Sequence, residues 1–109
     1  MGVTIRRFDV FYVRLDPTVG TEMNKTRPCV VVSPDEINNH LRRVLIAPLT
    51  SQRRRSPFRI DCEVGRRSGQ IAIDQMRVVD RARFGRKVAV LAEDEQGALL
   101  QGLAAMFAP

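Results

Sequence analysis

Residues 24–36 read NKTRPCVVVSPDE, a polar entry, an apolar run and a polar exit in thirteen positions. The run CVVV has no polar position, which is typical of a strand that is buried on both faces. After it, Ser33 as N-cap, Pro34 at the first helical position and Glu36 three residues beyond the cap predict a capping box. The stretch therefore predicts a buried strand that starts near Arg27 and leads into a short helix.

The segments that flank this stretch carry the alternation of half-buried strands. In residues 57–64 the alternation turns apolar side chains inward and Arg59, Asp61 and Glu63 outward. Residues 80–85 predict a brief helical turn. Strands are expected at residues 9–15, 43–49, 57–64, 70–79 and 86–91.

The last part of the chain changes period, because Leu99, Leu103 and Phe107 lie at helical spacing behind three acidic residues. Such a stripe predicts a helix packed against the sheet. The fold class expected from these patterns is mainly β: a strongly bent antiparallel sheet with short helices in its connections and a C-terminal helix. At 109 residues, the whole chain, 1–109, is expected to form a single domain.

Positive charge is concentrated in one quarter of the chain. Eight arginines and two acidic residues lie within 42–67, so this segment accounts for the whole formal charge of +6. Such a field attracts polyanions, although a solvated arginine-rich loop explains the charge equally well. No apolar stretch approaches the roughly 20 residues that cross a bilayer, and residues 1–11 lack the pattern of a signal peptide. We therefore expect a cytoplasmic protein without a membrane partner.

Standard catalytic and metal-binding motifs are absent from the sequence, which has no Gly-rich phosphate loop, no HExxH and no credible serine triad. Cys29 and Cys62 lie in strand-like runs without CxxC spacing and are expected to be buried, reduced thiols. With the sole histidine, His40, they form no zinc site. The sequence predicts no metal site.

Polar residues occur instead where strands begin, end or are interrupted. Arg27 opens one strand, Thr50 closes another, and Asp74 and Gln75 interrupt a third. The proline after Arg27 keeps this arginine extended, and the planar fork of guanidinium donors suits a phosphate group. Arg27 is therefore a candidate phosphate clamp.

A structural interpretation of the same residues is also open. Arg27 could pair with Asp16 or Glu22 across the preceding loop, and Thr50 could simply be a β-branched residue that ends its strand. Taken one residue at a time, the sequence favours this second interpretation.

The motifs DPTVGTE, NKTRPCVVVSP, IAPLTS, PF and DQMRVVD follow one another between residues 8 and 91. In this order they resemble the MazF/PemK family of toxin endoribonucleases, although Phe8 stands where family members commonly carry a glycine. The resemblance implies an SH3-like barrel of the CcdB/PemK type that forms a homodimer. It also implies cleavage of single-stranded RNA without metal or cofactor, and restraint by a small antitoxin with an acidic tail.

The resemblance also implies roles for individual residues. Arg27 and Thr50 would carry the cleavage, which yields a 2′,3′-cyclic phosphate and a 5′-hydroxyl. Because arginine stays protonated and is a poor general base, Glu22 on the preceding loop, the nearest carboxylate candidate, is expected to take that role. The residues expected to bind RNA are Asp16, Thr21, Glu22 and Gln75 by family position and Arg53, Arg54 and Arg55 by their charge.

Two other functions remain open from the sequence. The same barrel could serve as a non-catalytic module that binds nucleic acid or protein, as the gyrase-poisoning CcdB-like toxins do. It could also be a decayed toxin that still binds an antitoxin. The intact TRP and LTS motifs favour an active nuclease over both.

Overall fold

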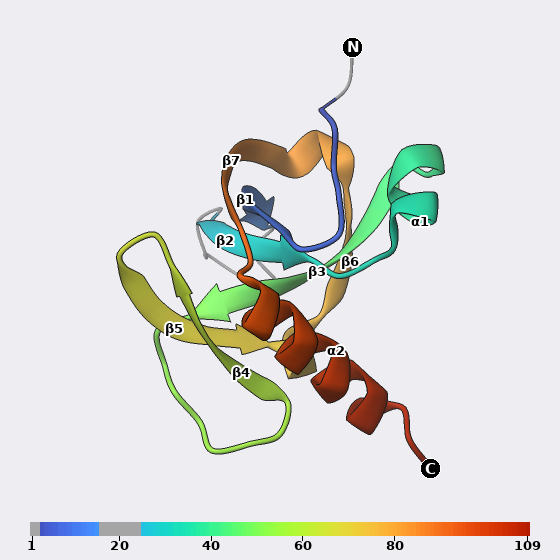
Figure 1. The fold of residues 1–109 in the computed structure, drawn as a ribbon. Helices are drawn as coiled ribbons and strands as arrows, with labels where there is room; N and C mark the ends of the chain where they lie inside the picture. The colour runs from blue at the N-terminus through green and yellow to red at the C-terminus, as the bar shows by residue number, and fades with distance from the viewer. Residues whose placement is uncertain (1–2, 16–24) are drawn as a thin grey trace, which may run out of the picture.

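The computed structural model describes residues 3–15 and 25–109, whose strands form one strongly curled antiparallel sheet (Figure 1). The strand order is β4-β5-β3-β2-β1-β7, and β6 also pairs with β3. The strands are β1 Asp9–Leu15, β2 Lys25–Val31, β3 Arg43–Thr50, β4 Arg59–Val64, β5 Arg67–Ala72, β6 Arg77–Asp80 and β7 Phe84–Val90. The other elements are helices α1 Asp35–His40 and α2 Glu93–Met106 and the 3₁₀ turns η1 Ile73–Gln75 and η2 Arg81–Arg83.

The apolar run of the opening stretch is buried on both faces, as predicted. Cys29 and Val31 belong to one core cluster, whereas Val30 and Val32 belong to the other. Because side chains alternate across a strand, a strand between two cores must be apolar at every position. Helix α2 packs against β4 (Figure 1).

The single strand predicted for residues 70–79 is wrong, because η1 divides it into β5 and β6. Both parts pair with β3, at Leu49↔Ile71 and at Ile46↔Arg77. Between these pairs β3 has only residues 47–48, whereas its partner has residues 72–76. The surplus residues form the 3₁₀ turn, which carries Asp74 and Gln75 out of the ladder.

The capping box predicted at α1 is also wrong. Helix α1 begins at Asp35 with Pro34 as N-cap and has no side-chain cap. The Ser33 hydroxyl donates instead to Asn38 Oδ1 at 2.6 Å and accepts from the Leu45 amide at 3.1 Å. Both partners are internal groups that would otherwise lack a hydrogen bond, so they take the hydroxyl away from the helix.

Helix α2 matches the predicted position but not the whole predicted stripe. Leu99 and Gly102 are buried, whereas Phe107, beyond the last helical residue, is 75% exposed. Gly102 allows a close approach, because a Cβ there would lie 2.7 Å from Ile73 Cδ1. Within residues 3–15 and 25–109, no helix has the length and apolarity needed to span a membrane.

Candidate functional site

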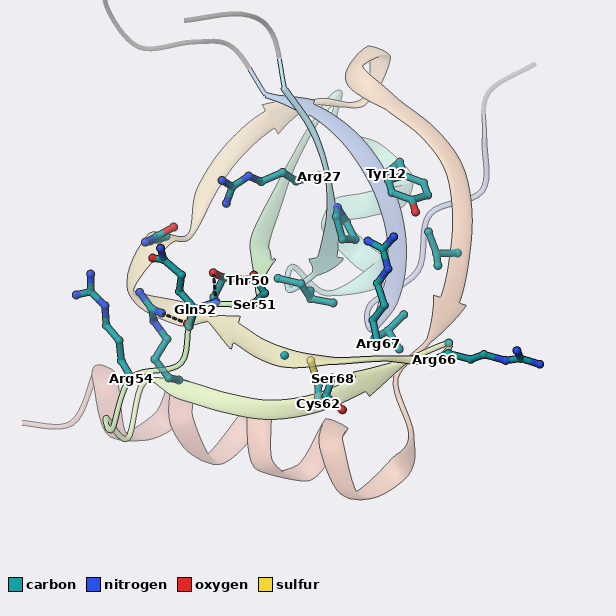
Figure 2. A pocket seen from close by; sticks show the side chains of 18 residues that line it. Tyr12, Arg27, Thr50, Ser51, Gln52, Arg54, Cys62, Arg66, Arg67 and Ser68 are labelled. Carbon is teal, nitrogen blue, oxygen red and sulfur yellow. Dashed lines mark hydrogen bonds between the residues drawn. The ribbon is translucent and has the colours of Figure 1, made fainter.

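The concave side of the curled sheet holds an open pocket of about 750 Å³ (Figure 2). Its walls come from β2, from the end of β3 with the loop after it, from the β4–β5 hairpin and from η1. Five arginines line the pocket, and no described lining residue is an acid. The polar and charged lining residues are Tyr12, Arg27, Thr50, Ser51, Gln52, Arg54, Arg59, Arg66, Arg67, Ser68 and Gln75.

Arg27 and Thr50 come together in this pocket although the chain separates them by 23 residues. Strands β2 and β3 are antiparallel, with Cys29 opposite Pro48. Continuing that register by two residues on each strand places Arg27 opposite Thr50. Directly opposed residues share one face of a sheet, and Figure 2 shows both side chains at the pocket. The two sequence candidates thus form one constellation.

Among the described residues, the Thr50 hydroxyl has one hydrogen-bond partner. Its Oγ1 accepts a hydrogen bond from the Gln52 amide at 3.1 Å, which leaves its proton available for donation into the pocket. Gly69 of β5 lies so close to the backbone of Thr50 that a Cβ at residue 69 would be 2.6 Å from the Thr50 carbonyl oxygen. The end of β3 is therefore held from both sides.

Arg27 is half-buried, with an extended backbone in β2. Within residues 3–15 and 25–109 its guanidinium makes no hydrogen bond or ion pair. The partners expected under the structural interpretation, Asp16 and Glu22, lie outside the described residues. The planar donor fork of Arg27 is therefore free of the described carboxylates and available to an anion.

Arg59, which the alternation predicted to point outward, is in fact buried with a side chain only 3% exposed. It donates from Nε to Asp74 Oδ1 at 2.7 Å and from NH2 to Asp74 Oδ2 at 3.2 Å. This hydrogen bonding raises the pKa of Arg59 and lowers the pKa of Asp74. The prediction failed because η1 and the loop after β3 cover that face of β4.

The three neighbouring arginines proposed to bind RNA occupy different surroundings. Arg54 lines the pocket, and Gln70 holds its backbone by hydrogen bonds to the amide at 2.9 Å and the carbonyl at 3.2 Å. Arg53 pairs with Asp61 at 3.2 Å, and Arg55 is exposed outside the lining. Only Arg54 of the three is therefore brought to the pocket.

The remaining sequence candidates divide between the pocket and the undescribed loop. Gln75 lines the pocket from η1. Asp16, Thr21 and Glu22 lie outside the described residues. Of the residues predicted from the sequence, the pocket thus contains Arg27, Thr50, Arg54 and Gln75.

Sequence reasoning missed several lining residues besides Arg59. Tyr12 of β1 lines the pocket, and the Arg86 guanidinium lies 5.4 Å from the centre of its ring. Arg66 and Arg67 enter the lining from the β4–β5 hairpin. The strand alternation already placed Tyr12 opposite the buried Phe11, and the charge count included both arginines, but neither pattern shows which surface they share.

Cys62 belongs to the pocket lining, whereas Cys29 and His40 do not. Burial raises the pKa of Cys29 to about 12 and that of Cys62 to about 11, so both remain protonated at neutral pH. Their predicted burial is confirmed, and both are free thiols. His40 is exposed at the end of α1. Among residues 3–15 and 25–109, no three His, Cys, Asp or Glu side chains group as metal ligands.

Comparison with known proteins identifies the class of protein. The model of the family of PemK-like, MazF-like toxins of type II toxin–antitoxin systems matches residues 6–107. The endoribonuclease toxin MazF of Escherichia coli K12 is 35% identical over 88 residues, which cover 80% of this chain and 79% of that protein. The chain therefore belongs to the PemK-like, MazF-like toxin family, as its motifs predicted.

Solved structures confirm the fold. MazF from Deinococcus radiodurans superposes with a TM-score of 0.79 at 23% identity, covering 95% of this chain and 96% of that one. A mycobacterial endoribonuclease in complex with its cognate antitoxin has a TM-score of 0.76 at 20% identity, covering 92% and 91% of the two chains. The mainly β, strongly bent architecture expected from the sequence is thus that of known MazF toxins.

Proposed function

We propose that this protein is the toxin of a type II toxin–antitoxin system and acts in the cytoplasm as a sequence-specific endoribonuclease on single-stranded RNA, including mRNA. Its family membership and its 35% identity to an endoribonuclease toxin support this activity. The observation that carries the proposal is the meeting of Arg27 and Thr50 in a pocket lined by five arginines. Such a pocket favours a polyanion with a reactive phosphodiester.

The proposed reaction uses a nucleophile that the substrate supplies. The ribose 2′-hydroxyl, which DNA lacks, attacks the adjacent phosphorus. The new O2′–P bond forms as the P–O5′ bond breaks, leaving a 2′,3′-cyclic phosphate on one fragment and a 5′-hydroxyl on the other. Negative charge grows on the two non-bridging phosphoryl oxygens as the bonds exchange. The 2′ proton passes to a general base and the leaving 5′ oxygen takes a proton from water, so the step needs no metal, cofactor or redox partner.

Arg27 and Thr50 are the groups proposed to stabilise that charge. A permanently charged guanidinium provides two parallel donors, and the free proton of the Thr50 hydroxyl provides a third. One fixed donor aimed at developing charge contributes roughly 2.7–4 kcal/mol to the transition state in comparable sites. Two such groups on opposed strands can therefore account for a large part of the catalysis.

A general base must take the 2′ proton, and arginine is unsuited to this because it stays protonated. We assign this role to Glu22. We assign RNA binding to Asp16, Thr21 and Gln75 and to the arginines Arg53, Arg54 and Arg55. The cationic pocket also suits the acidic tail of a cognate antitoxin, and solved relatives include a toxin bound to its antitoxin. By family resemblance, the protein acts as a homodimer.

Product analysis tests the proposal. The purified protein is incubated with a defined RNA in the presence of EDTA, and the ends of the fragments are identified. Cleavage to cyclic phosphate and 5′-hydroxyl ends is expected, with strong loss in Arg27→Ala and partial loss in Thr50→Ala. Arg42→Ala, an exposed arginine at the opposite end of β3, is the matched control. Intact cleavage by Arg27→Ala would overturn the mechanism, and RNA binding without cut strands would favour a non-catalytic module.

A further inference from the structure

The ion pair between the buried Arg59 and the partly exposed Asp74 joins two segments of the pocket that are distant in sequence. Arg59 is the first residue of β4, and Asp74 lies in η1. The pair is bidentate, with both carboxylate oxygens engaged at 2.7 and 3.2 Å. This two-point geometry fixes the orientation of both groups as well as their distance.

A third contact extends the pair toward Thr50. Arg59 NH1 donates to the Gln52 carbonyl oxygen at 3.4 Å, and the Gln52 amide donates to Thr50 Oγ1 at 3.1 Å. Gln52 thus accepts a hydrogen bond from Arg59 at its carbonyl and orients the Thr50 hydroxyl through its amide. The chain of contacts runs without interruption from the buried guanidinium to the proposed catalytic hydroxyl.

The other end of the pair leads to Gln75. Asp74 immediately precedes Gln75 in η1, and the Ile73 amide of the same turn donates to the Phe58 carbonyl beside Arg59 at 3.0 Å. The turn is therefore tied to the start of β4 at two points. Gln75 belongs to this turn and lines the pocket, so the attachment anchors the segment that carries it.

Stability alone is a weak reason for such a pair. Solvent weakens the attraction because the Asp74 side chain is 43% exposed, and the desolvation of the buried Arg59 guanidinium offsets part of what remains. Arg59 makes three directional hydrogen bonds, two to Asp74 in η1 and one to Gln52 in the loop after β3. Apolar side chains cannot join these two segments in this way. The arrangement is therefore better explained by geometry than by stability.

We propose that Arg59 and Asp74 are positioning residues of the nuclease: their ion pair orients the Thr50 hydroxyl through Gln52 and sets the position of Gln75. The inference rests on the proposed function and adds to it a pair of residues that act through Thr50 and Gln75. Its consequence is that the pair controls turnover by the folded enzyme, because misplacing a catalytic group by about 1 Å can cost about 100-fold in rate.

Steady-state kinetics on a short fluorogenic RNA test the inference. The variants are Arg59→Lys, which keeps the charge but loses the fork, and Asp74→Asn, which keeps the shape but loses the charge. Arg42→Lys and Asp80→Asn alter an exposed Arg–Asp pair at the opposite end of β3, 3.4 Å apart, and serve as controls. Well below the melting temperature, each test variant should lose about tenfold or more in kcat with at most a threefold change in KM.

The double variant Arg59→Lys/Asp74→Asn should be no slower than the slower single variant, because the pair acts as one unit. A purely structural role would lower the melting temperature and leave the kcat of the folded protein unchanged. That result for either folded variant overturns the inference. If Arg59→Lys does not fold, Asp74→Asn decides, since the Asp74 side chain is 43% exposed.

Backbone amide shifts separate this inference from the proposed function. If the wild-type protein cleaves no RNA under any condition, the proposed function fails, and the positioning role is judged from the amides of Gln52 and Gln75. Arg59→Lys should shift both resonances more than Arg42→Lys does. Equal shifts in the two variants would overturn the positioning role, whatever the activity.

Discussion

The close approach of β5 to the end of β3 makes Gly69→Ala a sensitive test of the site geometry. A Cβ at residue 69 would lie 2.6 Å from the Thr50 carbonyl oxygen and 3.4 Å from its carbonyl carbon. Contacts below 3.0 Å are not sustained, and the obstructing atom belongs to the backbone. Residue 50 must therefore move by at least about 0.4 Å, or the β3–β5 ladder must open.

The size of the effect follows from two opposing terms. Overpacking of this kind costs about 1–3 kcal/mol, whereas alanine lowers the entropy of the unfolded chain and returns about 0.4–1 kcal/mol. The central values leave a net loss of about 1.3 kcal/mol, equivalent to a melting temperature about 6 °C lower for a domain of this size. A shift of Thr50 by this amount should also lower kcat by about three- to tenfold.

The matched control is Gly97→Ala in helix α2, where the added Cβ meets no atom within 4 Å. Alanine in this exposed helical position should stabilise the protein by about 0.5–1 kcal/mol and leave cleavage unchanged. Thermal unfolding and steady-state cleavage of a short RNA measure both effects. The reasoning is refuted if Gly69→Ala melts and cleaves like the wild type, or if both alanine variants behave alike.

Three further predictions follow from the electrostatics and burial of the pocket. Arg54→Gln should weaken RNA binding at low salt and reduce the slope of log affinity against log salt concentration by about 0.7, measured by fluorescence anisotropy. In the native protein the thiols of Cys29 and Cys62 should react slowly with Ellman's reagent at pH 8, because burial raises the pKa of these thiols to about 12 and about 11; both should react fully in denaturant. The hydrogen bond from Arg59 lowers the pKa of Asp74 below its value in the unfolded chain. The ionised carboxylate therefore stabilises the fold above about pH 4, and this stabilisation is lost as the pH falls through the native pKa. In urea unfolding, the loss of stability caused by Asp74→Asn should accordingly shrink below about pH 4.

Each of the three has an outcome that contradicts it. An unchanged salt slope in Arg54→Gln would show that this side chain contacts no phosphate. Thiols that react at the rate of a free thiol in the native protein would contradict their burial. A deficit of Asp74→Asn that stays constant down to pH 2 would show that the carboxylate gains nothing from its ionised form.

The strands could be predicted from the sequence wherever one local rule determines them. Residues 9–15 alternate and form β1 with those bounds, and the apolar run after Arg27 lies between two cores as its composition requires. The break at η1 has no such local signal, because it arises from unequal chain lengths opposite β3. Ser33 likewise satisfies the helix-cap pattern, yet tertiary partners take its hydroxyl.

The candidate site divides in the same way. Motifs mark Arg27, Thr50 and Gln75 in the sequence, and all three line the pocket. The register of β2 and β3, continued beyond Cys29↔Pro48, explains why the first two lie close together. Arg59 carries no such mark. The alternation of side chains along β4 assigns Arg59 to the solvent face. That face is covered only because the chain returns at η1, which also brings the Asp74 carboxylate to the arginine.

The two kinds of residue also differ in how substitutions should reveal them. A group proposed to donate to the phosphate, such as Arg27, should lose its contribution with its own side chain, so no change elsewhere should restore it. A group that acts through others, such as Arg59, loses its effect equally when Asp74 is changed, so only paired substitutions expose it. A search of this fold by single alanine substitutions would rank Arg59 as a stability residue, because its removal leaves a carboxylate unpaired and lowers the melting temperature at the same time. The kcat of the folded fraction is therefore the quantity that distinguishes orientation of Thr50 from support of the sheet.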